Sequence, residues 1–188
     1  MTKKIVLAGP PRSGKSCLRE GLKQALRNFP DAPYPYVITA CPDGEGSWFQ
    51  ETVNHDAELA GELKAAYKAK FTPEFVQRIA DSVRNCSLEL TLVDIGGIPS
   101  VENEQICASA THMVILAGDP SRIPEWYEFA NKVGLTVIAE IHSDYHGKED
   151  NVGIAQDGIL RGSVHHLERG ESISSRPMVS ALAEHILS

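Results

Sequence analysis

The sequence predicts an α/β fold of three layers, in which helices cover both faces of a mainly parallel sheet. Short apolar segments alternate along the chain with longer segments whose apolar residues recur at helical spacing. This alternation is typical of parallel strands joined by helical crossovers. The chain has 188 residues, of which 42% are hydrophobic, and this length suits one domain with a sizeable core. We therefore expect a single domain over residues 1–188.

The expected strands are short apolar segments bounded by turn residues. They cover residues 5–8, 36–41, 88–94, 113–117, 135–141 and a short segment near 162–167. The expected helices have apolar residues at helical spacing, and they cover residues 17–26, 57–70, 73–85, 101–110, 123–133 and 177–187. Thr72 and Pro73 stand in the order of a helix cap and a first helical residue. The polar segment 142–157 is expected to be irregular.

The loop between the first strand and the first helix carries the most specific motif. Residues 9–16 read GPPRSGKS, a full match to the phosphate-binding pattern G-x-x-x-x-G-K-[ST]. Backbone N–H groups of such a loop wrap phosphates, and the N-terminus of the following helix adds partial positive charge. The motif predicts a P-loop NTPase fold that binds a nucleotide with Mg²⁺. The residues expected to bind the nucleotide are Gly9, Pro10, Pro11, Arg12, Ser13, Gly14, Lys15, Ser16 and Cys17.

Three side chains are candidates for phosphate and metal chemistry. Lys15 would reach the β- and γ-phosphates, and the Ser16 hydroxyl would ligate Mg²⁺. Asp94 ends an apolar strand and precedes Ile-Gly-Gly, so it is the candidate for the carboxylate on the metal side. The glycines fit a loop that approaches the γ-phosphate closely. The alternative interpretation is an aspartate that merely ends a strand before a glycine turn.

The loop after the second expected strand reads CPDGEGSW at 41–48. Ligands of open α/β sheets bind beyond the carboxyl ends of the strands, so we expect this loop to face the same crevice. Asp43 or Glu45 could act as a general base toward water or a phosphoryl acceptor. The catalytic candidates are therefore Lys15, Asp43 and Glu45. A solvated acidic turn, with Trp48 packed on the next helix, explains the same residues equally well.

Charge and composition exclude several classes of function. Eighteen Lys and Arg residues stand against 25 Asp and Glu residues, which gives a formal net charge of −7. This balance argues against an extensive nucleic-acid surface. The four cysteines include no C-x-x-C pair, which favours reduced thiols over a zinc site or a disulfide framework. No apolar run approaches the roughly 20 residues of a membrane span, and we expect a cytoplasmic protein with no membrane partner.

Positive charge over a transferring phosphoryl group often comes from an arginine. Arg12 lies in the loop itself, where it would touch phosphate or point to solvent. Four arginines on later loops are further candidates, and nothing in the sequence ranks them: Arg122, Arg161, Arg169 and Arg176. His165 and His166 alternate in an expected strand, so one of them should face inward and be hydrogen-bonded.

Several segments together resemble the P-loop domain of certain CRISPR-associated ring-nuclease proteins. They are GPPRSGKS, ITACPDGEGSWF, LVDIGGIPSVENEQI, ATHMVIL and GLTVIAEIHSD, and they span most of residues 4–145. In that family an ATPase-like domain is fused to a small domain that degrades cyclic oligoadenylate. The resemblance implies that Gly9, Gly14, Lys15 and Ser16 contact phosphate and Mg²⁺, with Asp94 as the acid on the metal side.

No segment of this sequence corresponds to the nuclease domain. The resemblance therefore implies a stand-alone or excised P-loop domain, for which cyclic-oligoadenylate cleavage is not expected. A ring nuclease or another CRISPR-associated protein is the partner that the resemblance suggests.

Three functions stay open at this point. The first is an ATP-binding enzyme, either a hydrolase or a kinase-like phosphotransferase, in or beside CRISPR signalling. The second is a GTPase-like switch, and the third is a module that binds a nucleotide or an adenylate messenger without turnover. The later strands lack an N-K-x-D segment that would read guanine, which favours ATP over GTP. The acidic pair Asp43 and Glu45 favours turnover over binding alone.

Overall fold

The computed structural model describes residues 2–41, 71–154 and 156–188. Its sheet has seven strands in the order β2-β3-β1-β4-β5-β7-β6. All neighbouring strands are parallel except β6 and β7, which are antiparallel. The strands are β1 Lys3–Ala8, β2 Pro35–Thr39, β3 Leu90–Asp94, β4 His112–Ala117, β5 Thr136–Asp144, β6 Asn151–Ile154 and β7 Leu160–His165.

The described helices begin and end at recognisable signals. They are α1 Lys15–Arg27, α4 Pro73–Asn85, α5 Val101–Cys107, the short 3₁₀ helix η1 Pro120–Arg122, α6 Ile123–Val133 and α7 Pro177–Leu187. At the start of α4, Thr72 Oγ1 accepts a hydrogen bond of 3.2 Å from the Phe75 N–H, as the cap-then-proline order predicts. Helix α6 ends at Gly134, whose φ of 83° is left-handed.

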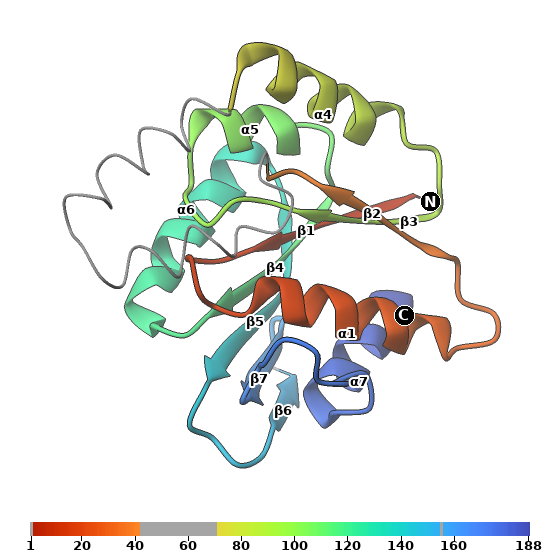
Figure 1. The fold of residues 1–188 in the computed structure, drawn as a ribbon, viewed down its shortest axis with the longest axis vertical. Coiled ribbons are helices and arrows are strands. Elements are labelled where there is room, and N and C mark those ends of the chain that lie inside the picture. Colours follow the sequence, from red (N-terminus) through yellow and green to blue (C-terminus); the bar gives the residue numbers. More distant parts are fainter. Residues whose placement is uncertain (1, 42–70, 155) are drawn as a thin grey trace.

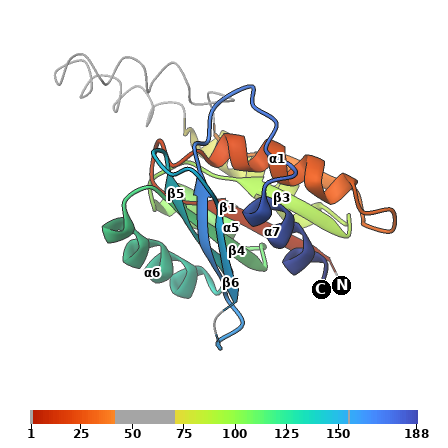
Figure 2. The same ribbon diagram turned by 90° about the horizontal axis from the view of Figure 1, so that it is seen from below.

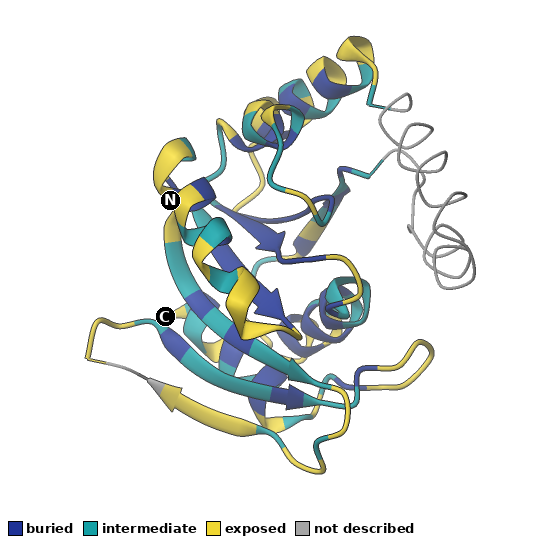
Figure 3. Cartoon of the chain, turned by 90° about the vertical axis from the view of Figure 1, so that its left-hand side faces the viewer, coloured by how far each residue is buried: buried dark blue, intermediate teal, exposed yellow. Residues whose placement is uncertain are grey.

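Helices cover both faces of the sheet, as the sequence predicts (Figures 1 and 2). Side chains alternate along β1, so that Ile5 and Leu7 face one side and Val6 and Ala8 face the other. Helices α1 and α7 pack on the first side, and α4, α5 and α6 pack on the second. The central strands are buried on both faces, which explains their nearly continuous apolar sequences (Figure 3).

The register of the central strands places the candidate site at one edge of the sheet. Strand β1 lies between β3 and β4 and runs parallel to both. Leu7 is paired with Asp94 on one side and with Val114 on the other. The loop after β1 and the loops after β3 and β4 therefore leave the sheet at the same edge, where ligands of open α/β sheets bind.

The sequence prediction was wrong for part of the segment 142–157. Strand β5 continues to Asp144, and β6 occupies Asn151–Ile154. The described part of β6 forms an exposed sheet edge paired only with β7, so its residues need no apolar alternation (Figure 3). The expected helix 57–70 lies outside the described residues. Of the helices in the described ranges, none combines the length and the apolar character that a membrane crossing requires.

Gly9 offers a test of how closely the loop after β1 must approach β4. Its φ is 141°, and a Cβ added there would lie 1.8 Å from the Leu116 carbonyl oxygen. We expect Gly9→Ala to lower the free energy of unfolding by about 2–4 kcal/mol, from left-handed strain and overpacking together. Chemical denaturation measures this loss.

Gly134→Ala is the matched control, because Gly134 has a φ of 83° but no atom within 4 Å of an added Cβ. It should cost only about 1–2 kcal/mol, from backbone strain alone. Equal losses in the two variants would contradict the close approach at Gly9.

Candidate functional site

The loop 9–14 has the backbone geometry of an anion-binding turn followed by a helix. Gly9, Arg12 and Gly14 have φ values of 141°, 63° and 84°. Gly14 is the N-cap of α1, and as a glycine it has no side chain that could cap this helix end. The first N–H groups of α1 therefore have no partner within the helix, which makes this end suited to phosphate oxygens.

Lys15 folds back over this loop. Its Nζ donates hydrogen bonds of 2.8 Å to the Gly9 carbonyl and 2.9 Å to the Pro10 carbonyl. Burial lowers the pKa of Lys15 from 10.5 to about 8, although the nearby Asp94 carboxylate opposes this shift. The ammonium group is thus held at the loop by weak carbonyl partners, and a phosphate would offer it a stronger one.

Asp94 lies beside Lys15, as the sequence predicts. It ends β3, is buried, and interacts electrostatically with Lys15. The loop after it touches the phosphate-binding loop, because a Cβ added at Gly97 would lie 2.6 Å from the Pro11 nitrogen. Burial raises the pKa of Asp94, while Arg19 and Lys15 act in the opposite direction.

A buried arginine, which the sequence did not single out, contacts this carboxylate. Arg19 Nη1 donates a hydrogen bond of 3.0 Å to Asp94 Oδ2. Arg19 lies on α1 one turn after Lys15, so both side chains reach the same end of the sheet. Its spacing from Lys15 was the signal that could have identified it.

The donor set at this position suits Mg²⁺. Asp94 offers carboxylate oxygens and Ser16 a hydroxyl oxygen, and such hard ligands are those that Mg²⁺ prefers. The two other predicted acidic residues, Asp43 and Glu45, lie outside the described residues, as does Trp48. Their proximity to Lys15 stays a prediction.

A pocket of about 310 Å³ adjoins the loop on the side of β4, β5 and β7. Arg12 and Gly14 form its wall at the phosphate-binding loop, and Leu167 forms an apolar part of it. Strand β5 and the residues after it contribute the segment 142–146. His142 lines this pocket, and its Nδ1 atom is buried without a hydrogen-bond partner among the residues that the structure describes.

Aromatic rings stand beside the pocket. Tyr145, half of which is exposed, lies 4.9 Å from the His166 ring and 5.4 Å from the His146 ring between centroids. Its hydroxyl donates a hydrogen bond of 2.5 Å to Glu168. Planar groups of this kind stack readily on a nucleobase.

Asp150 anchors the pocket wall, and sequence reasoning missed it. Its buried carboxylate accepts hydrogen bonds from the His165 N–H (3.0 Å) and the Met178 N–H (3.0 Å). The same carboxylate contacts His165 Nδ1 at 2.5 Å, which confirms that one histidine of the pair 165–166 is inward and hydrogen-bonded. Asp150 thereby caps α7, although strands β6 and β7 separate it from this helix in the sequence.

Ion pairs hold several of the candidate arginines in place. They join Arg122 to Glu125 (2.7 Å), Arg161 to Asp157 (2.9 Å) and Arg176 to Glu171 (2.8 Å). Burial raises the pKa of the Cys17 thiol at the start of α1, and the positive charge of Arg169 is the largest opposing influence on it.

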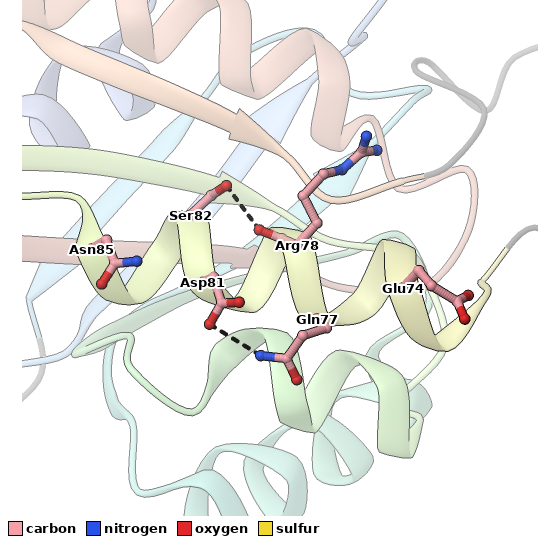
Figure 4. Close-up of a pocket in the computed structure, with 6 residues that line it drawn as sticks. All are labelled: Glu74, Gln77, Arg78, Asp81, Ser82 and Asn85. Atoms are coloured by element: carbon pink, nitrogen blue, oxygen red, sulfur yellow. Dashed lines mark hydrogen bonds between the residues drawn. The ribbon is translucent and has the colours of Figure 1, made fainter.

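A second depression lies on α4, away from the loop (Figure 4). Two hydrogen bonds join residues that line it. Gln77 Nε2 donates to Asp81 Oδ1 at 3.0 Å, and Ser82 Oγ donates to the Arg78 carbonyl at 2.9 Å (Figure 4). This arrangement is that of a solvated helix face.

Two solved structures resemble the fold. The septum site-determining protein MinD from Pyrococcus horikoshii OT3, complexed with Mg-ADP, has a TM-score of 0.55 and 15% identity, covering 79% of this chain and 73% of that one. A protein described as a plasmid partition protein from Borrelia burgdorferi B31, bound to AMPPNP, has a TM-score of 0.58 and 13% identity, covering 99% and 96%. Searches of family models and of curated proteins found no match. The likeness shows a P-loop NTPase fold.

The lowered pKa of Lys15 predicts a specific pH dependence of stability. Between pH 8 and about 10.5 the unfolded chain holds this proton more tightly than the folded protein does. The free energy of unfolding of the nucleotide-free protein should therefore rise with pH over that interval, by about 3 kcal/mol. Urea denaturation at several pH values measures it.

Lys15→Met removes the titrating group and keeps the side-chain length, so this variant should lack that rise. At each pH, the free energy of unfolding of the wild type is compared with that of the variant. Parallel curves for wild type and variant would contradict the burial of a charged Lys15.

Proposed function

We propose that this protein binds ATP with Mg²⁺ and acts as a P-loop nucleoside triphosphatase or kinase-like phosphotransferase. The observation that carries the proposal is the convergence of three features at one edge of the sheet. These are the uncapped N-terminus of α1, the Lys15 ammonium and the buried Asp94 carboxylate. The adenine nucleotides bound to the two similar structures support the same ligand class.

Each group has a defined role in this proposal. Backbone N–H groups of the loop and of the first turn of α1 bind the phosphate oxygens. Lys15 exchanges its carbonyl partners for the β- and γ-phosphates, which are stronger acceptors. Ser16 and Asp94 would hold the Mg²⁺, which neutralises phosphate charge when bound. The loop 95–97 touches Pro11, so it is placed to respond to the γ-phosphate.

The pocket beside the loop is the proposed base site. Its volume of about 310 Å³ suits a nucleobase with part of its sugar. The His142 ring, which lines the pocket, would bind a polar edge atom of the base, and Leu167 would pack against the base. Residues His142, Ser143 and Asp144 stand where β5 ends and do not form an N-K-x-D segment, so we propose adenine rather than guanine.

Turnover is the finer part of the proposal. Asp43 and Glu45 are the proposed general-base candidates, since phosphoryl transfer needs a group that orients water or an acceptor. The link to CRISPR signalling is likewise a proposal, and it rests on the sequence segments that resemble the ring-nuclease P-loop domain. A single cytoplasmic domain with a ring nuclease or related protein as partner completes this proposal.

Nucleotide-dependent thermal stability tests the function. ATP with Mg²⁺ should raise the Tm of the wild-type protein by mass action, and GTP should raise it less. Lys15→Met should abolish the rise, because the variant lacks the cation that faces the phosphates. Differential scanning fluorimetry measures the shift, and phosphate release from the same samples reports hydrolysis.

Lys23→Met is the matched control, because it removes a lysine of the same helix whose Nζ pairs with Glu20 instead of the loop. It should keep the ATP-induced shift. A wild-type Tm that ignores every nucleotide would refute the proposal, and equal shifts with ATP and GTP would refute the adenine assignment.

A second prediction concerns the base site. His142→Leu should weaken ATP binding roughly tenfold, because the base loses one hydrogen-bond partner in a partly buried pocket. His185→Leu changes a half-buried histidine in the last turn of α7, which does not line this pocket, and should leave the Kd within about twofold of wild type. Isothermal titration calorimetry measures both. Inorganic triphosphate, which lacks a base, should bind both variants as it binds the wild type. If the ATP affinity of His142→Leu also equals that of the wild type, the base does not contact His142.

A further inference from the structure

Arg19 is unusual in its surroundings. It lies on the face of α1 that carries the buried leucines 18, 22 and 26, and only 7% of its charged side chain is exposed. A buried guanidinium is costly unless it is paired and hydrogen-bonded. Its buried partner is Asp94, whose side chain is 9% exposed. The buried face of α1 thus carries the positive charge of Arg19, and the Asp94 carboxylate at the candidate metal position compensates it.

The Arg19–Asp94 pair bears on metal binding through both geometry and charge. A carboxylate oxygen that accepts a hydrogen bond from a guanidinium at 3.0 Å is committed to that donor. Lys15 places a second positive charge near the same carboxylate. A divalent cation that approaches Asp94 therefore meets two resident cations, one of which occupies an oxygen that the metal would use.

Arg19 also has a second acceptor in place. Its Nη2 lies 3.1 Å from Glu20 Oε1, and its Nε donates to the same oxygen at 3.2 Å. The Glu20 side chain is 45% exposed and also pairs with Lys23 at 2.5 Å. The guanidinium can therefore yield Asp94 and keep a carboxylate partner.

We propose that Arg19 is a positioning residue that holds the Asp94 carboxylate in the metal-free site and competes with the divalent cation for it. Arg19 thereby sets the Mg²⁺ concentration that nucleotide binding requires. Glu20 lowers this requirement, because it stabilises Arg19 when Asp94 turns to the metal. This inference rests on the proposed function, in that it takes Asp94 as the acid on the metal side.

The test measures the Mg²⁺ concentration at half-maximal thermal stabilisation by AMPPNP, which avoids turnover. Arg19→Gln keeps an amide donor but removes the charge, and it should lower this midpoint by about tenfold or more. Arg27→Gln removes a positive charge two turns further along the helix, where the guanidinium donates to the Tyr34 hydroxyl, and its midpoint should stay within about twofold of wild type. An unchanged or higher midpoint in Arg19→Gln overturns the proposal.

Glu20→Gln keeps the test valid if Arg19→Gln does not fold, because Glu20 is largely at the surface. This variant should raise the Mg²⁺ midpoint, since Arg19 then has Asp94 as its remaining strong acceptor among these two carboxylates. A midpoint equal to that of wild type contradicts the competition. Where both variants fold, the effect of Glu20→Gln should disappear in the Arg19→Gln background.

Binding of Mn²⁺ to the nucleotide-free protein separates this proposal from the proposed function. Electron paramagnetic resonance of unbound Mn²⁺ should show that Arg19→Gln retains more metal than wild type, and that the further change Asp94→Asn removes the gain. If Arg19→Gln gains Mn²⁺ but no nucleotide stabilises the wild type, only the nucleotide function fails. If AMPPNP stabilises the wild type but Arg19→Gln behaves like it with both metals, only the role of Arg19 fails.

Discussion

The parallel pairing of β1 with both β3 and β4 determines where the phosphate side of the candidate site lies. Because Leu7 is level with Asp94, the phosphate-binding loop and the metal-side acid leave the sheet together. Gly9 then passes so close to the Leu116 carbonyl that no side chain fits between them. The phosphate side of the site is therefore attached to the buried centre of the sheet, and the close packing of the three central strands fixes its geometry.

The site holds two cationic side chains and one carboxylate close together. Burial disfavours both the Lys15 ammonium and the Asp94 carboxylate, and each is kept near the other. Arg19 adds a second cation to the same carboxylate. A polyphosphate with a divalent ion brings both signs of charge into this position, so its binding must rearrange the existing pairs. In the proposed function, such a rearrangement would make nucleotide affinity depend on protein side chains that do not touch the nucleotide.

The sequence predicted the fold and the loop well because each depends on local pattern. Buried parallel strands give continuous apolar runs, and the loop motif fixes its own backbone. It could not predict β6, whose exposed edge lacks any pattern, or the partner of Arg19, because the pairing joins residues 75 positions apart. Asp150 was missed for the same reason, since its hydrogen-bond partners His165 and Met178 come from β7 and α7.

Different parts of the chain build the two sides of the candidate site. The phosphate side is formed by the loop after β1, the first turn of α1 and Asp94 at the end of β3. The proposed base side is lined by residues 142–146 at the end of β5 and by Leu167 after β7. The Asp150 carboxylate joins the segment after β5 to His165 on β7 and to Met178 at the start of α7. Because separate segments hold the two sides, a change within 142–146 should alter the proposed base site and leave the phosphate side in place.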